Sequence, residues 1–114
     1  MTDYIQIRKV PGKWSVRSGG AILGETTNAL ELLEGDLPPV IYFPRKDIAM
    51  ALLDKTDKVT HCPHKGHATH YSIVNRSSVT ENAVWSYEDP IPAVAQIKGY
   101  LAFYPVESVK IEQI

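Results

Sequence analysis

Cysteine is almost missing from this sequence: among its 114 residues only Cys62 carries a thiol. A single cysteine cannot form a disulfide within the chain, so no disulfide framework supports the fold. It also cannot supply the paired Cys-x-x-Cys ligands that hold structural zinc. We therefore expect a domain without structural zinc, suited to a reducing compartment such as the cytoplasm.

Long hydrophobic runs are missing as well. The longest, such as VIYF at 40–43, fall far short of the ~20 apolar residues that cross a bilayer. The first residues do not combine a basic region with an apolar core, which a secretory signal would have. We expect a cytoplasmic protein without a membrane partner.

The sequence also lacks an excess of charge of one sign. Twelve Lys and Arg stand against thirteen Asp and Glu, so the net charge is −1. Such a chain has no broad basic surface for nucleic acid. Neither a Walker loop nor a Gly-x-Gly-x-x-Gly turn is present, and this argues against phosphate binding by a standard loop. Nucleic acid is therefore not an expected partner.

Apolar residues, in contrast, are plentiful at 44% of the chain. A chain of this size and composition can bury a core, and we expect one compact domain over residues 1–114. Alternating and β-branched segments predict strands over 4–10, 13–17, 20–25, 40–43, 69–75, 82–87, 100–104 and 109–114. The strand over 100–104 is apolar enough to be central and covered on both faces.

The other segments are shorter or ambiguous. Residues 28–35 fit either a capped helix or an extended segment, of which we favour the extended one. A short helix is predicted over 44–53, a polar loop over 54–58, and helical turns near 94–98 that end at Gly99. The pattern predicts a mainly β domain of antiparallel sheets with one or two short helices.

All four histidines lie in the stretch HCPHKGHATHY at 61–71, three residues apart. This spacing is one residue short of the i, i+4 pair with which a helix holds a metal. In an extended chain, histidines three apart would be separated by roughly 9 Å, too far to share an ion, although a turn could bring two or three of them together. We predict no metal site, and interpret His64, His67 and His70 as polar surface. An incidental affinity for nickel or zinc is left open.

Within this stretch, Cys62-Pro63-His64-Lys65-Gly66 has the composition of a tight turn, with proline second and glycine last. Such a turn can bring the Cys62 thiol and the Lys65 ammonium to one small volume. The ammonium, together with neighbouring His61, would favour the nucleophilic thiolate. The alternative is that Cys62 is a small buried hydrophobe and that Lys65 lies in solvent.

A second candidate group lies in WSYEDP at 85–90. In a strand, Trp85, Tyr87 and Asp89 point to one face, and Ser86 and Glu88 point to the other. Two aromatic rings that end in a carboxylate suit a binding pocket with a stacking surface. They equally suit the edge of a core whose last carboxylate caps the next turn.

Four segments taken together resemble the family named domain of unknown function 427. They are VIYFPRKD (40–47), THCPHKG (60–66), NAVWSYEDP (82–90) and IKGYLAFYP (97–105). The resemblance implies a β-tent architecture, shared with methionine-R-sulfoxide reductases and glutathione-dependent formaldehyde-activating enzymes. Those relatives hold zinc with paired cysteines, which this chain lacks. The family's nucleotidyltransferase-like label implies carboxylates that hold Mg²⁺, but the sequence has no Asp-x-Asp pair.

The resemblance implies that certain side chains meet in one cleft. They are the family's polar, thiol and aromatic positions, here Arg45, Cys62, Lys65, Trp85, Tyr87 and Lys98. Our first hypothesis is therefore a domain that binds a small anionic or aromatic ligand. Trp85 and Tyr87 would be its walls, with Asp89 beside them. Its anchors for an anion would be Arg45, Lys65 and Lys98.

The alternative hypothesis is a thiol-dependent enzyme with Cys62 as nucleophile or redox centre. Lys65 and His61 would activate the thiol, and Tyr87 or Asp89 would assist proton transfer. Without a second cysteine, an outside thiol would have to resolve any oxidised form. A further alternative is a structural or interaction domain, in which residues 109–114 form an edge strand of a homodimer. The sequence does not identify a cofactor.

Overall fold

The computed structural model describes residues 4–114, which form three antiparallel sheets and three short 3-10 helices. The strands are β1 (Ile5–Lys9), β2 (Trp14–Ser18), β3 (Ala21–Thr26), β4 (Leu30–Glu34), β5 (Val40–Tyr42), β6 (Leu53–Cys62), β7 (Gly66–Val74), β8 (Val79–Ser86), β9 (Ala102–Phe103) and β10 (Val109–Gln113). The helices are η1 (Arg45–Asp47), η2 (Met50–Leu52) and η3 (Pro92–Ile97). The predicted mainly β fold is confirmed.

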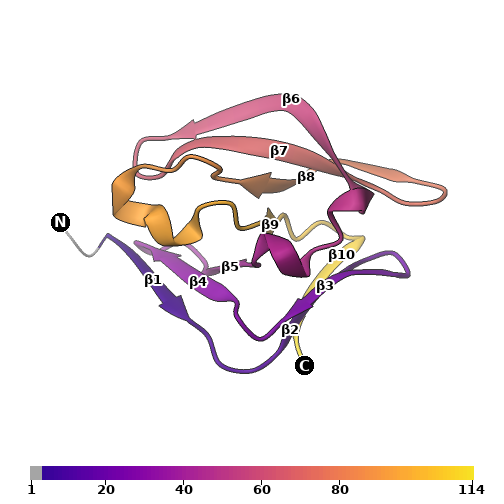
Figure 1. Cartoon of the computed structure of the whole chain (residues 1–114), viewed down its shortest axis with the longest axis horizontal. Helices are drawn as coiled ribbons and strands as arrows, with labels where there is room; N and C mark the ends of the chain where they lie inside the picture. The colour runs from indigo at the N-terminus through magenta and orange to yellow at the C-terminus, as the bar shows by residue number, and fades with distance from the viewer. Residues whose placement is uncertain (1–3) are drawn as a thin grey trace.

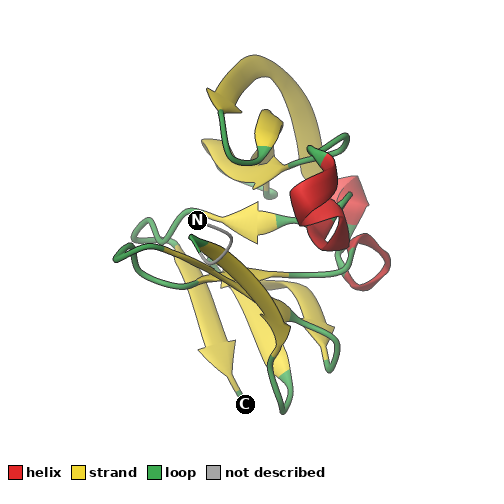
Figure 2. Cartoon of the chain, turned by 90° about the vertical axis from the view of Figure 1, so that its left-hand side faces the viewer, coloured by secondary structure: helices red, strands yellow, loops and turns green. Residues whose placement is uncertain are grey.

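The sheets have the strand orders β1-β4-β5, β10-β2-β3 and β6-β7-β8-β9. Figure 1 shows the third sheet above the other two, with the first at the lower left and the second at the lower right. Figure 2 shows the short helices gathered along one side of the molecule. Because β4 pairs with both β1 and β5, the prediction that residues 28–35 are extended is confirmed.

Phe43 and Leu101 join the first sheet to the third. Each donates its backbone N–H to the carbonyl of the other, with N···O distances of 2.8 and 2.9 Å. Phe43 directly follows β5, and Leu101 directly precedes β9. This bridge holds the end of β5 against the four-stranded sheet, and the site described below lies near that junction.

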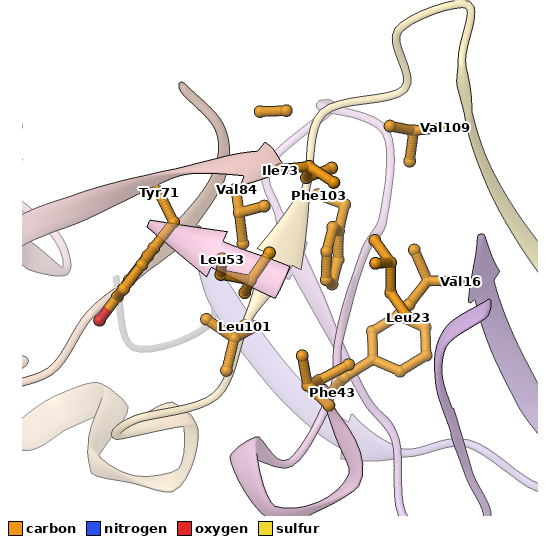
Figure 3. Packing of buried hydrophobic residues seen from close by; sticks show 12 residues of the cluster. Val16, Leu23, Phe43, Leu53, Tyr71, Ile73, Val84, Leu101, Phe103 and Val109 are labelled. Atoms are coloured by element: carbon orange, nitrogen blue, oxygen red, sulfur yellow. The ribbon is translucent and has the colours of Figure 1, made fainter. Parts of the chain in front are cut away.

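The main apolar core fills the space between the second and third sheets (Figure 3). Its members include residues far apart in sequence: Val16, Leu23, Phe43, Ile73, Val84, Leu101 and Phe103. Phe43 and Phe103 meet edge to face at a centroid distance of 5.8 Å. Figure 3 also shows the Tyr71 hydroxyl pointing away from this cluster.

A second apolar cluster connects the first sheet, the third sheet and η3. Its buried members are Leu32, Tyr42, Ala68, Tyr87, Val94, Ile97 and Ala102. Cys62, Trp85 and Tyr100 pack against it while remaining partly exposed. Since several of these side chains carry polar groups, this cluster is the part of the interior where a site can form.

The predicted helix over 44–53 is wrong, because the segment forms two separate 3-10 turns, η1 and η2. Ile48 lies between them in an extended conformation and forms a β-bridge with Gly24. The following residue, Ala49, donates its N–H to the Leu23 carbonyl. Pairing with β3 therefore interrupts the helix that the apolar spacing predicted.

Two further predictions are corrected. Residues 54–58 are not a loop but part of β6, whose pairing with β7 is irregular between Lys55 and Val59. They are polar because β6 is an edge strand with mostly exposed side chains. The strand predicted over 100–104 shrinks to β9 and ends the sheet rather than lying at its centre, although Leu101, Ala102 and Phe103 are buried as expected.

The histidine-rich stretch forms the hairpin of β6 and β7, and Cys62 pairs with Gly66 across the turn. Gly66 has a φ of 113°, a conformation that L side chains rarely adopt, so glycine suits this position. His70 was expected at the surface, but the structure buries it completely at 0% exposure. Its Nε2 lies 3.3 Å from the Tyr104 hydroxyl. Over residues 4–114, no helix has the length and apolar character to span a membrane.

Candidate ligand-binding site

The turn after β6 directs Lys65 inward. The Lys65 N–H donates to the Cys62 carbonyl, and the Lys65 carbonyl accepts from the Ile91 N–H, at 3.1 and 3.0 Å. These two bonds fix the backbone on both sides of the side chain. As a result Lys65 is only 8% exposed, although lysine is the residue type least often buried unless it is paired.

The Lys65 ammonium forms an ion pair with the Glu34 carboxylate at the end of β4. Only 10% of the Lys65 side chain and 12% of the Glu34 side chain are exposed. The same ammonium lies 5.9 Å from the centre of the Tyr87 ring, within the range of a cation–π interaction. The pair therefore has a protein environment on most sides.

Aromatic side chains surround this ion pair. The Trp85 indole donates to the Tyr42 hydroxyl at 3.2 Å, and the two rings meet edge to face. The Tyr104 ring lies 4.5 Å from the Trp85 ring, centre to centre. Tyr87 completes the group below the Lys65 ammonium. Three of these four rings carry a hydroxyl that can hydrogen-bond a ligand.

A cavity of about 180 Å³ opens among these groups. Its walls are Leu32, Glu34, Leu37, Pro38, Val40, Tyr42, Thr60, Lys65, Trp85, Tyr87 and Tyr104. Apolar bodies with a few converging polar groups are typical of small-molecule sites. Burial is the main reason that the pKa values of Tyr42 and Tyr87 lie well above their ordinary range, so both remain hydroxyl donors at neutral pH.

An apolar groove of about 540 Å³ adjoins the cavity. It shares four wall residues with the cavity, namely Leu37, Pro38, Val40 and Trp85. Its other walls include Trp14, Ile41 and Ile111. Trp85 is therefore a wall of both spaces. The cavity contains the polar groups of Lys65 and Glu34, whereas the walls of the groove are almost wholly apolar.

Arg45 lies in a different group of side chains. Its guanidinium donates to the Gly99 carbonyl at 3.0 Å, to Ser86 at 3.3 Å and to Glu88 at 2.8 Å. The Tyr71 hydroxyl also donates to Glu88. This network ties η1, β8 and the loop before β9 together. With a further contact to the Tyr71 hydroxyl at 3.4 Å, these bonds use four of the five guanidinium N–H groups, and Arg45 is not among the walls of the cavity.

Glu88 provides a pH-dependent prediction. Burial acts to raise the pKa of its carboxyl, but the Tyr71 hydroxyl and the Arg45 guanidinium outweigh it and hold the pKa below its ordinary value of 4.5. Because the pKa of the Glu88 carboxyl is lower in the folded than in the unfolded state, the interactions of its carboxylate stabilise the fold at pH values above the ordinary pKa of 4.5. This stabilisation is lost as the pH falls through the lower pKa of the folded state.

Replacing Glu88 with glutamine should therefore flatten the dependence of stability on pH between about pH 5 and 3. Urea unfolding at several pH values would measure the slope. Glu107→Gln is the matched control, because Glu107 is exposed and has no ion pair among residues 4–114. If both variants keep the slope of the unaltered protein, the Arg45–Glu88 pair is not the source of the dependence.

The residues that the sequence singled out for ligand binding do not all meet. Lys65, Trp85 and Tyr87 line the cavity, whereas Arg45 belongs to the Glu88 network. Asp89 and Lys98 are exposed and are not among the cavity walls. The predicted alternation along the strand is seen in Trp85 and Tyr87, which face the cavity, and in Ser86 and Glu88, which face Arg45. The alternation continues for two residues beyond the end of β8 at Ser86, and the exposed Asp89 does not continue it.

The thiol hypothesis concerned Cys62, Lys65 and His61. Cys62 is half-buried and packs against the second apolar cluster, and His61 is exposed. Among residues 4–114, the side-chain hydrogen bond of the Lys65 ammonium goes to Glu34. The Lys65 ammonium, which was expected to activate the Cys62 thiol, is thus paired with the Glu34 carboxylate. Thiol catalysis by Cys62 stays a prediction.

Three residues of the cavity were missed by sequence reasoning. Glu34 lies 31 positions before Lys65, in a segment whose ambiguity drew attention to its backbone only. Tyr42 and Tyr104 were noted as parts of apolar runs, so their hydroxyls went unused. Both tyrosines lie within segments that resemble the family, VIYFPRKD (40–47) and IKGYLAFYP (97–105), and this was the available signal.

A scan against protein families matches residues 6–113 to the family described as Domain of unknown function (DUF427). A search of curated proteins found no match. The match covers β1 except for its first residue and all of the other strands, and it includes the whole cavity. The chain belongs to the DUF427 domain family.

Proposed function

We propose that this domain binds a small planar ring compound with an anionic group, in the cavity beside Lys65 and Glu34. The observation that carries the proposal is the nearly buried Lys65–Glu34 ion pair, which faces a cavity with aromatic walls. Such a combination of charge and stacking surface supports recognition of a small molecule rather than of a polymer.

The ion pair itself favours a role in recognition. A buried ion pair seldom stabilises a protein more than well-packed apolar residues would, because both charges lose their hydration. A pair that lines a cavity is therefore a candidate for function. The Lys65 ammonium has three N–H donors and uses one of them on Glu34, so donors remain for an anionic ligand.

Glu34 restricts the ligand further. Its carboxylate would repel a simple anion, so the ligand needs an N–H or O–H donor next to its anionic group. The anion would then bind Lys65 while the donor binds Glu34. The cavity of about 180 Å³ is slightly larger than a cavity of about 150 Å³ that holds benzene in another protein. One ring with one substituent fits this volume.

Calorimetric titration with matched ring compounds tests the proposal. Pyrrole-2-carboxylate, with its N–H beside the carboxylate, should bind tightest. Furan-2-carboxylate has the same shape without the donor and should bind at least about tenfold more weakly, the effect of one hydrogen bond to a charged group. Cyclopentanecarboxylate lacks the flat π face for Trp85 and should also bind more weakly.

A pair of variants locates the binding. Trp85→Leu should weaken pyrrole-2-carboxylate binding, since Trp85 is a wall of the cavity. Trp14→Leu is the matched control, because Trp14 lines the adjoining groove and not the cavity. The proposal fails if no ring acid binds, or if Trp85→Leu and Trp14→Leu reduce the affinity equally.

A further inference from the structure

Two of the four histidines lie directly opposite each other on the β6–β7 hairpin. His61 pairs with His67 in the antiparallel register, and both side chains are exposed. Their ring centres are 4.7 Å apart, and the ring planes are tilted by 46°. The hairpin turn thus brings together two of the histidines, the possibility that the sequence had left open.

We propose that His61 and His67 form a two-histidine binding site for a divalent transition metal. A metal bound by imidazole lies about 2.0–2.1 Å from the nitrogen, hence roughly 3.2 Å from the ring centre. Two rings that share one ion at the observed separation would subtend an angle of roughly 95° at the metal. Because both side chains are exposed, each ring can turn to direct a nitrogen at the ion.

The angle indicates which metals the site would take. Roughly 95° is close to the right angle between neighbouring ligands in octahedral or tetragonal coordination, and is well below the tetrahedral angle that zinc prefers. Nickel(II) and copper(II) accept imidazole ligands in these geometries. Water would complete the coordination. The site differs from a structural zinc site, because residues 4–114 contain no cluster of three or more His, Cys, Asp or Glu side chains suited to one ion.

The other two histidines are placed differently. His64 lies in the turn, with its ring 4.8 Å from the ring of Tyr4. His70 is fully buried beside Tyr104. His64 is exposed, like His61 and His67, but it has no histidine opposite it on the hairpin. It therefore provides a matched control.

Calorimetric titration of the full chain with Ni²⁺ tests the site. Nickel is the probe because it does not oxidise the thiol of neighbouring Cys62. Two tethered ligands bind about 10²–10⁴ times tighter than one alone. His61→Ala and His67→Ala should therefore each weaken Ni²⁺ binding about 100-fold or more, and His64→Ala should leave it within about twofold. The double variant His61→Ala/His67→Ala measures binding elsewhere on the chain.

Ni²⁺ should also raise the thermal unfolding midpoint of the unaltered protein and of His64→Ala, but not that of the His61 or His67 variants. All three substitutions are at exposed positions, so the variants are expected to fold. The proposal is overturned if His64→Ala weakens binding as much as His61→Ala does. It is also overturned if the double variant binds Ni²⁺ as tightly as the unaltered chain.

Discussion

Replacing Lys65 with methionine is expected to lower the free energy of unfolding by about 3–5 kcal/mol. The substitution removes the ammonium but leaves the Glu34 carboxylate, only 12% exposed, without its counter-ion. The neighbouring Tyr42 and Tyr87 rings provide little solvation for an unpaired charge. Urea or guanidinium unfolding measures the loss directly.

The double variant Lys65→Met/Glu34→Leu is the matched control. It removes both charges and leaves apolar side chains of similar size, and such replacements are often neutral or stabilising. It should therefore recover most of the stability that the single variant loses. If both variants are equally destabilised, Lys65 contributes through its packing and not through the ion pair. A stable double variant that no longer binds pyrrole-2-carboxylate would separate the pair's role in recognition from its effect on folding.

Replacing Phe43 with alanine should cost a similar amount, about 3–5 kcal/mol. Phe43 is fully buried, and its ring meets Phe103 edge to face in the main core. Removing the ring leaves a cavity that the surrounding strands cannot close, because the Phe43 backbone is fixed by its two hydrogen bonds with Leu101. The thermal midpoint of unfolding should fall by roughly 10–20 °C.

Phe43→Leu is the graded control for this prediction. Leucine keeps the backbone bridge and fills part of the space, so it should cost roughly half as much as alanine. A loss below about 1 kcal/mol for alanine would show that the Phe43 ring does not hold the sheets together, and equal losses in the two variants would show that partly filling the space does not restore the packing of the ring. The measurement thus distinguishes packing of the ring from pairing of the backbone.

Most strands could be predicted because their sequences carry local signals. β2 and β3 are joined at Gly19, whose φ of 59° suits the glycine found there, and they pair as a hairpin. The segment with the ambiguous pattern, 28–35, was harder, since leucines at alternating and at helical spacings overlap in it. This segment forms a strand because β4 pairs with β1 and β5, and only the tertiary structure provides these partners.

The errors have the same origin. Ile48, Ala51 and Leu52 have a helical spacing, but backbone pairing of Ile48 with Gly24 divides the segment into two turns. Residues 54–58 are polar and were predicted to form a loop. An exposed edge strand needs no apolar alternation, so the sequence carried no strand signal there. In both cases a contact distant in sequence overrides the local preference.

The candidate site shows the same division. The turn that presents Lys65 and the alternation of Trp85 and Tyr87 are local features, and both could be predicted. The partners of the charged residues could not, because Glu34 and Glu88 lie 31 and 43 positions from Lys65 and Arg45. The opposite placement of His61 and His67 likewise depends on the register of the hairpin. A spacing argument that assumes one straight segment cannot reveal it.

Nuclear magnetic resonance provides the most direct test of the proposed ligand site, because the chain has two tryptophans and only Trp85 lines the cavity. The indole N–H of Trp85 donates to Tyr42, so its signal reports on that contact. On titration with pyrrole-2-carboxylate we predict a saturable shift of the Trp85 indole signal while the Trp14 indole signal stays in place. If neither signal moves, or if both move equally, the cavity beside Lys65 and Glu34 is not the binding site.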